Sequence, residues 1–108
     1  MRVSYRQTAR DDLVRQFRYY LVTLNLPEVA LRFREAVRQS VQSLRRHPLA
    51  GPRYPVGTPR LQNLRTWPVA GFEHIRIYYV PEEEAIHVIR ILHGKRDVRE
   101  ILEREEEM

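Results

Sequence analysis

The last strand and the last helix predicted for this chain meet in Ile89-Arg90-Ile91-Leu92-His93-Gly94-Lys95-Arg96-Asp97. The β-branched and aliphatic residues that begin this segment predict a strand, and Gly94 predicts a sharp turn after it. In a structural interpretation, Gly94 adopts unusual backbone angles, Asp97 caps the final helix, and the basic side chains are only solvated. In a functional interpretation, the rigid end of the strand holds an imidazole and two cations at one site. The segment by itself does not decide between the structural and the functional interpretation.

A meander of three antiparallel strands is predicted in the second half of the chain, at about 61–67, 72–80 and 85–93. Side chains alternate along the middle strand, with Ile75, Ile77 and Tyr79 on one face and His74, Arg76 and Tyr78 on the other. One face of the sheet is therefore apolar and must be covered by another layer.

Two amphipathic helices are predicted in the first half of the chain. Thr8 followed by Asp11 resembles a capping box, and apolar residues then recur every three or four positions over about 9–24. Pro27 suits the first turn of a second helix, which continues to about Arg46. Because so few residues join the helices, they must pack as an antiparallel hairpin.

These elements predict a two-layer α+β fold in one domain, residues 1–108. A short strand at 2–6 comes first, the helix hairpin covers the apolar face of the sheet, and the three-stranded meander follows. A short C-terminal helix runs from Asp97 to about Glu105, and we expect the acidic end at about 103–108 to fray.

Composition excludes several classes of protein. The chain has 108 residues, 43% of them hydrophobic, which is enough for a modest core. It has no apolar stretch of membrane-spanning length and no recognisable signal segment, and the absence of cysteine suits a cytoplasmic location. The four histidines lack the spacing of metal ligands, so we expect neither a metal site nor a cofactor.

Charge is distributed unevenly along the chain. Residues 1–80 hold 14 arginines and 5 acidic residues, a balance of +9, whereas residues 81–108 have a balance of −4. A basic domain of this kind is expected to meet a polyanion or an acidic protein partner.

An ordered set of positions between residue 3 and about residue 100 resembles one known family: Ser4, Ala9, Asp12-Leu13, Tyr20, Pro27, Ala30, Phe33, Leu44, Pro48, Gly51, Leu64-Arg65, Tyr78 and Leu92-His93-Gly94-Lys95-Arg96-Asp97. In this set the chain is similar to the RelE/ParE superfamily of toxins from bacterial type II toxin–antitoxin systems. The resemblance implies the same α+β fold that the residue patterns predict.

The superfamily has two branches with different activities. The RelE-like branch cleaves messenger RNA on the ribosome, and the ParE-like branch inhibits DNA gyrase by contact. The alignment puts Ile75 and Leu102 where the nuclease branch carries a phosphate-binding arginine and a functional tyrosine, while Arg96 matches a second arginine. An isoleucine cannot stabilise a phosphorane, so the resemblance favours the ParE-like branch.

The resemblance implies a gyrase-inhibiting toxin that a cognate antitoxin neutralises, in a toxin–antitoxin hetero-oligomer and without a catalytic site. The residues expected to bind the target or the antitoxin are Arg65, Arg76, Arg90, His93, Lys95 and Arg96. Two alternatives stay open: a ribosome-dependent nuclease with a site built from Arg65, Arg76, Arg90, His93 and Arg96, and a non-toxic family member that only binds antitoxin.

Overall fold

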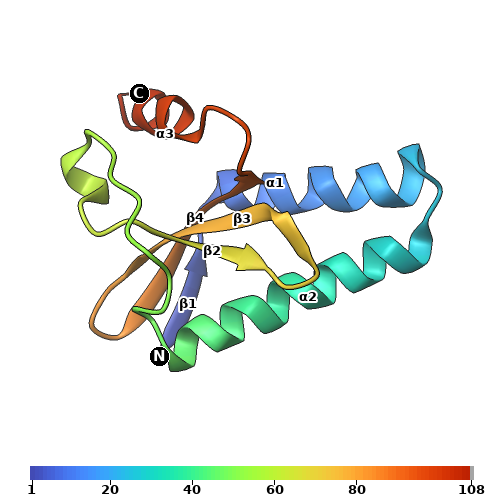
Figure 1. Ribbon diagram of the computed structural model, residues 1–108, viewed down its shortest axis with the longest axis horizontal. Helices are drawn as coiled ribbons and strands as arrows, with labels where there is room; N and C mark the ends of the chain where they lie inside the picture. The colour runs from blue at the N-terminus through green and yellow to red at the C-terminus, as the bar shows by residue number, and fades with distance from the viewer. Residues whose placement is uncertain (108) are drawn as a thin grey trace.

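A computed structural model, which describes residues 1–107, shows a four-stranded sheet with a helix hairpin on one side (Figure 1). The elements follow in the order β1 (Arg2–Tyr5), α1 (Gln7–Arg18), the π-helical segment η1 (Tyr19–Thr23), α2 (Pro27–Arg46), the 3-10 turn η2 (Pro59–Leu61), β2 (Arg65–Val69), β3 (Phe72–Pro81), β4 (Ala85–His93) and α3 (Val98–Glu106). The predicted α+β class and the order of its strands and helices are confirmed.

The strands lie in the order β1-β4-β3-β2, so the last strand of the chain lies inside the sheet. β1 runs parallel to β4, while β3 pairs antiparallel with both β4 and β2. The register shifts between Tyr78 and Tyr79, where the two strands form an irregularity. Tyr78 and Tyr79 are successive residues of β3 and point to opposite faces, so they enter two different apolar clusters, one on each side of the sheet.

The hairpin covers the face of the sheet that carries Ile75, Ile77 and Tyr79, as the alternation predicts. Its packing is aromatic near the β2–β3 turn, where the ring of Tyr20 lies 5.5 Å from that of Phe33 and 5.7 Å from that of Phe72. The helix residues buried in this first core include Ala9, Ala30, Phe33, Val37, Val41 and Leu44.

The opposite face of the sheet is also covered, which the sequence did not predict. Tyr78, Ile89 and Leu92 lie in a second core beneath the 47–64 loop and α3. The cover consists of Leu61 and Leu64 from the loop and Val98 and Leu102 from α3. Alternation along β3 predicts one apolar face and one polar face, and it groups Tyr78 with His74 and Arg76 on the polar face. The Tyr78 ring is in fact buried.

Several predicted boundaries are corrected. α1 begins at Gln7, and the Thr8 hydroxyl donates to Glu105 instead of capping the helix. The strand predicted at 61–67 begins only at Arg65, because a 3-10 turn precedes it. α3 continues to Glu106, and Met108, the last residue of the segment expected to fray, lies outside the described residues. Within residues 1–107, no helix has the length and apolar character needed to cross a membrane.

Candidate functional site

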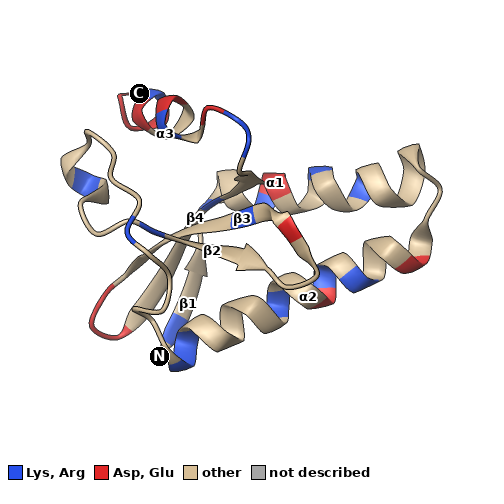
Figure 2. Ribbon diagram, viewed as in Figure 1, with Lys and Arg blue, Asp and Glu red and all other residues tan. Residues whose placement is uncertain are grey.

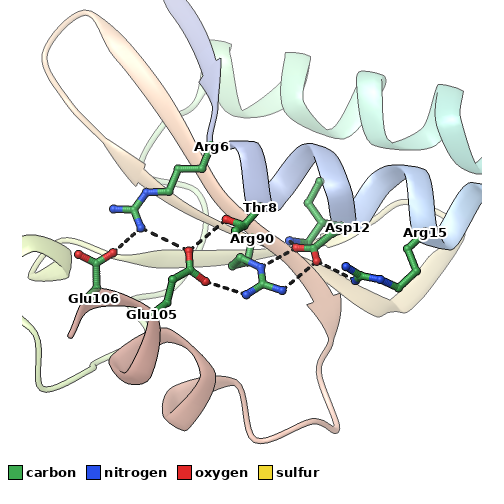
Figure 3. Close-up of polar contacts among 8 residues, drawn as sticks. Arg6, Thr8, Asp12, Arg15, Arg90, Glu105 and Glu106 are labelled. Atoms are coloured by element: carbon green, nitrogen blue, oxygen red, sulfur yellow. Dashed lines mark hydrogen bonds and ion pairs between the residues drawn. The ribbon is translucent and has the colours of Figure 1, made fainter. Parts of the chain in front are cut away.

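A buried ion pair joins α1 to the end of β4 (Figure 3). Arg90 donates to both carboxylate oxygens of Asp12, at 2.8 and 2.9 Å, and the Asp12 side chain is almost fully buried. These hydrogen bonds favour the charged guanidinium, and they raise the pKa of Arg90 above its ordinary value. Arg90 was expected on a binding surface, but it is engaged inside the molecule.

Asp12 also satisfies the edge of β4. β1 ends at Tyr5, opposite Val88, so the strand edge beyond that point has no neighbouring strand. The backbone N–H of Ile91 donates to Asp12 at 3.0 Å, so the carboxylate takes the place of a strand partner. Asp12 therefore fixes α1 to the sheet through both charge and backbone.

The same cluster holds the acidic helix α3 in place (Figure 3). Glu105 accepts hydrogen bonds from Arg90 at 2.7 Å and from the Thr8 hydroxyl at 3.0 Å, and Glu106 pairs with Arg6. Asp97 accepts from the N–H of Glu100 at 3.2 Å, as a helix cap should. The molecule's own acidic segment thus occupies part of the basic face that was expected to receive a partner.

Arg65 is likewise engaged in the fold. Its guanidinium donates to the carbonyl oxygens of Gly51 at 2.7 Å and Leu49 at 3.2 Å. The Tyr79 hydroxyl supports the same loop, since it donates to the Pro48 carbonyl and accepts from the Gly51 N–H. Arg65 therefore holds the 47–53 loop against the sheet.

Four of the six expected residues do come together, at the turn after β4. We call Arg76, His93, Lys95 and Arg96 the basic turn. The imidazole of His93 lies with its centroid 5.1 Å from that of His74, and burial together with the charges of His74 and Arg96 lowers the pKa of His93. Lys95 and Arg96 are exposed.

Gly94 shapes the basic turn in a different way from that expected. Asn25 and Gly71 alone among residues 1–107 have positive φ, so Gly94 does not need unusual backbone angles. Instead, its lack of a side chain leaves room for Arg76, whose Cδ lies 3.0 Å from the place where a Cβ would stand. Arg76 itself donates to the Thr66 hydroxyl at 3.0 Å. No three His, Asp or Glu side chains of the described chain are placed to hold a metal ion.

An apolar groove between α1 and α2 was not anticipated from the sequence. It has a volume of about 470 Å³ and is lined mainly by Tyr5, Leu13, Val14, Phe17, Phe33 and Val37. Arg10 stacks over the Tyr5 ring and Arg34 over the Phe17 ring, so cations flank the apolar floor. Val14, an apolar residue outside the series Ala9, Leu13 and Phe17 that recurs every four positions, was the signal available in the sequence.

Comparison with known protein families identifies the family of this chain. The family model for the ParE toxin of the type II toxin–antitoxin system parDE matches residues 3–98. The chain belongs to the ParE toxin family. The match ends at Val98, the first residue of α3.

Among solved structures, the chain is similar to a chromosomal ParDE toxin–antitoxin system from P. aeruginosa, with 23% sequence identity and a TM-score of 0.65. The alignment covers 86% of this chain and 95% of the other. At this identity the similarity establishes the fold, which is that of a ParE toxin. A search of curated proteins finds no match.

Proposed function

We propose that this ParE family toxin inhibits DNA gyrase by direct contact and that a cognate antitoxin neutralises it in a hetero-oligomeric complex. The family match supports the toxin assignment. The choice of gyrase as the target rests on the burial of two residues, Ile75 and Leu102. Both positions correspond to functional residues of the nuclease branch, to which the chain is also similar.

The observation that carries the proposal is the burial of Ile75 and Leu102. Each residue is about 1% exposed: Ile75 lies beneath the helix hairpin, and Leu102 lies on the face of α3 that packs into the second core. Cleavage of RNA requires cations on the scissile phosphate and groups that move protons. Apolar side chains inside two cores supply neither, and Arg90 is already paired with Asp12 and Glu105. A contact mechanism needs only a surface.

A second candidate, the ribosome-dependent nuclease, is favoured by one feature. The basic turn places the imidazole of His93 beside His74 and near the cations Arg76 and Arg96. A neutral imidazole with a lowered pKa can accept a proton at neutral pH, and the arginines could contact a phosphate. The cluster has no carboxylate partner among its named members, so the roles of acid and base are not both filled.

Two purified assays separate these functions. Gyrase with supercoiled plasmid should accumulate cleaved DNA when the toxin is added, while messenger RNA in a reconstituted translation system should stay intact. Codon-specific cleavage of messenger RNA without an effect on gyrase would assign the nuclease instead. A protein inactive in both assays that still binds its antitoxin would be the non-toxic family member.

For the antitoxin, we propose that the basic turn receives an acidic segment. Lys95 and Arg96 are exposed, and the two residues lie on the loop that leads into α3. Charge complementarity of this kind steers association and sets orientation. Arg65 and Arg90 are left out of this surface, because both are engaged in the fold.

A further inference from the structure

The end of the helix hairpin is an uncharged, apolar surface. Residues 19–27, Tyr-Tyr-Leu-Val-Thr-Leu-Asn-Leu-Pro, contain no charged side chain, and Figure 2 shows the turn between the two helices in tan, followed by the acidic first turn of α2. We call the exposed apolar members of this stretch the hairpin tip: Tyr19, Leu21, Val22, Leu24 and Leu26. Val22 is the most exposed of them, at 66%. So many adjacent apolar side chains in water indicate an interaction surface.

The hairpin tip projects beyond the sheet (Figure 1). α2 has 20 residues and so is about 30 Å long, at 1.5 Å per residue. The sheet lies against the start of α1 and the end of α2. The turn between the two helices extends beyond it and has no layer to pack on. The projection explains why these side chains are exposed despite their apolar character.

The conformation of the tip is fixed from within. The π-helical segment η1 is closed by a hydrogen bond of 2.9 Å from the Leu24 N–H to the Tyr19 carbonyl. One residue of this segment, Tyr20, is buried against Phe33 and Phe72, whereas its neighbours Tyr19 and Leu21 are exposed. π-Helical turns are rare and occur frequently at functional sites. The anchored Tyr20 holds the apolar residues in place before any partner arrives, which reduces the ordering that binding requires.

Charge around the hairpin tip points to the chemistry of the partner. A hollow of about 600 Å³ beside the tip is lined by Val14, Tyr19, Val22 and Thr23 together with Arg15, Arg18 and Asp11. Arg32 and Arg34 follow on α2, where Glu28 is the one acidic residue of the first two turns. An apolar centre bordered mainly by cations matches a surface that has an apolar hollow and an acidic rim.

We propose that the hairpin tip is the part of this toxin that inserts into gyrase, at a cleft with an apolar floor and an acidic rim. The inference rests on the proposed function. A projecting, convex surface is buried best by a concave surface of a folded protein, whereas an extended antitoxin segment is better matched to a groove or to the basic turn. Tyr19 supplies the aromatic anchor that is typical of the centre of such interfaces.

The test uses purified gyrase, supercoiled plasmid and single substitutions. Val22→Asp and Leu24→Asp should each raise the concentration needed for half-maximal cleaved DNA at least tenfold, while Val22→Ile should behave as wild type. Leu49→Asp is the matched control, because Leu49 is 65% exposed and lies beyond the other end of α2. It should leave gyrase inhibition unchanged. Thermal melts should coincide for all four variants, since the substituted side chains are on the surface.

The outcomes are distinguishable. If Val22→Asp and Leu24→Asp inhibit gyrase with the same potency as wild type, the hairpin tip does not contact gyrase. The inference then fails, while the proposed function stands. If the wild-type toxin has no effect on gyrase, the proposed function fails and the inference with it. Light scattering after gel filtration tests whether the hairpin tip binds a second copy of the chain instead. A wild-type dimer that Val22→Asp converts to a monomer would show this self-association and overturn the inference.

Discussion

Asp12 and Arg90 are 78 positions apart in the chain and meet through two hydrogen bonds, with the Asp12 side chain 1% exposed and that of Arg90 12% exposed. A buried charge that loses its partner is costly, because water cannot replace the lost contacts. The pair therefore ties the start of α1 to the end of β4, and Glu105 extends the same contact to α3.

Removal of the Asp12 carboxylate should destabilise the fold strongly. We expect Asp12→Ala to lower the free energy of unfolding by about 3–5 kcal/mol, since it removes the two hydrogen bonds that Arg90 donates to Asp12 and leaves the Ile91 N–H unpaired. Asp12→Asn should cost less, because its amide oxygen can still accept from that N–H. Urea denaturation measures both. Glu35→Gln breaks an ion pair on the surface and should leave the midpoint unchanged. Equal effects of Asp12→Ala and Glu35→Gln would contradict the buried role.

Two glycines should differ in their sensitivity to substitution by alanine. A Cβ at Gly51 would lie 2.8 Å from the Tyr79 hydroxyl oxygen and well inside contact distance of the Thr66 carbonyl. We expect Gly51→Ala to lower the free energy of unfolding by about 1–3 kcal/mol. A Cβ at Gly94 approaches the flexible Arg76 side chain at 3.0 Å and meets the His74 carbonyl oxygen only at an ordinary contact distance of 3.9 Å, so Gly94→Ala should change stability by no more than about 0.5 kcal/mol. A large loss at Gly94 would show that Arg76 cannot move.

Stability should depend on pH through His93. Burial, followed by the charges of His74 and Arg96, lowers its pKa below the ordinary 6.5. The unfolded chain therefore binds a proton near pH 6.5, whereas the folded protein binds it only at lower pH. The contribution of His93 to the free energy of unfolding should be fully present above about pH 6.5. It should decrease as the pH falls from about 6.5 to the pKa of His93 in the folded protein. The difference between urea midpoints of wild type and His93→Gln, measured from pH 7.5 to 5, should shrink over that window. A constant difference would exclude His93.

Association with the antitoxin should depend on salt. Exposed charges are screened over about 8–10 Å near physiological ionic strength, so the association rate of a partner steered by the basic turn should decrease as salt increases. Lys95→Ala with Arg96→Ala should reduce both the rate and its sensitivity to salt. Because both side chains are exposed, the unfolding free energy should change by no more than about 0.5 kcal/mol. Stopped-flow mixing measures the rates. An association rate of the wild-type toxin that does not change with salt would contradict electrostatic steering.

Local patterns were sufficient to predict most of the fold. Alternation along β3 indicated which face the hairpin covers, and Pro27 marked the start of α2. The π-helical segment η1 could not be predicted, because its apolar spacing is close to that of an α-helix. The 47–64 loop and α3 cover the second face of the sheet through contacts between distant segments, which local periodicity does not report.

The candidate site was predicted only in part, because local sequence does not report contacts between distant segments. His93, Lys95 and Arg96 are neighbours in sequence, and their grouping needed no knowledge of the fold. Arg65 and Arg90 looked equally available as cations, yet their partners, a loop carbonyl and the carboxylate of Asp12, lie far away in the chain. The burial of an arginine depends on such partners, and a single sequence does not show them.

The place of β4 has a consequence for synthesis of the toxin. This strand lies between β1 and β3, yet it is the last of the four strands to be made. A nascent chain that has not released residue 93 from the ribosome has no partner for β1 and none for the inner edge of β3, so the sheet cannot close. The fold of the toxin can therefore form only after β4 has been made, and a message truncated before β4 yields a product whose sheet is not closed.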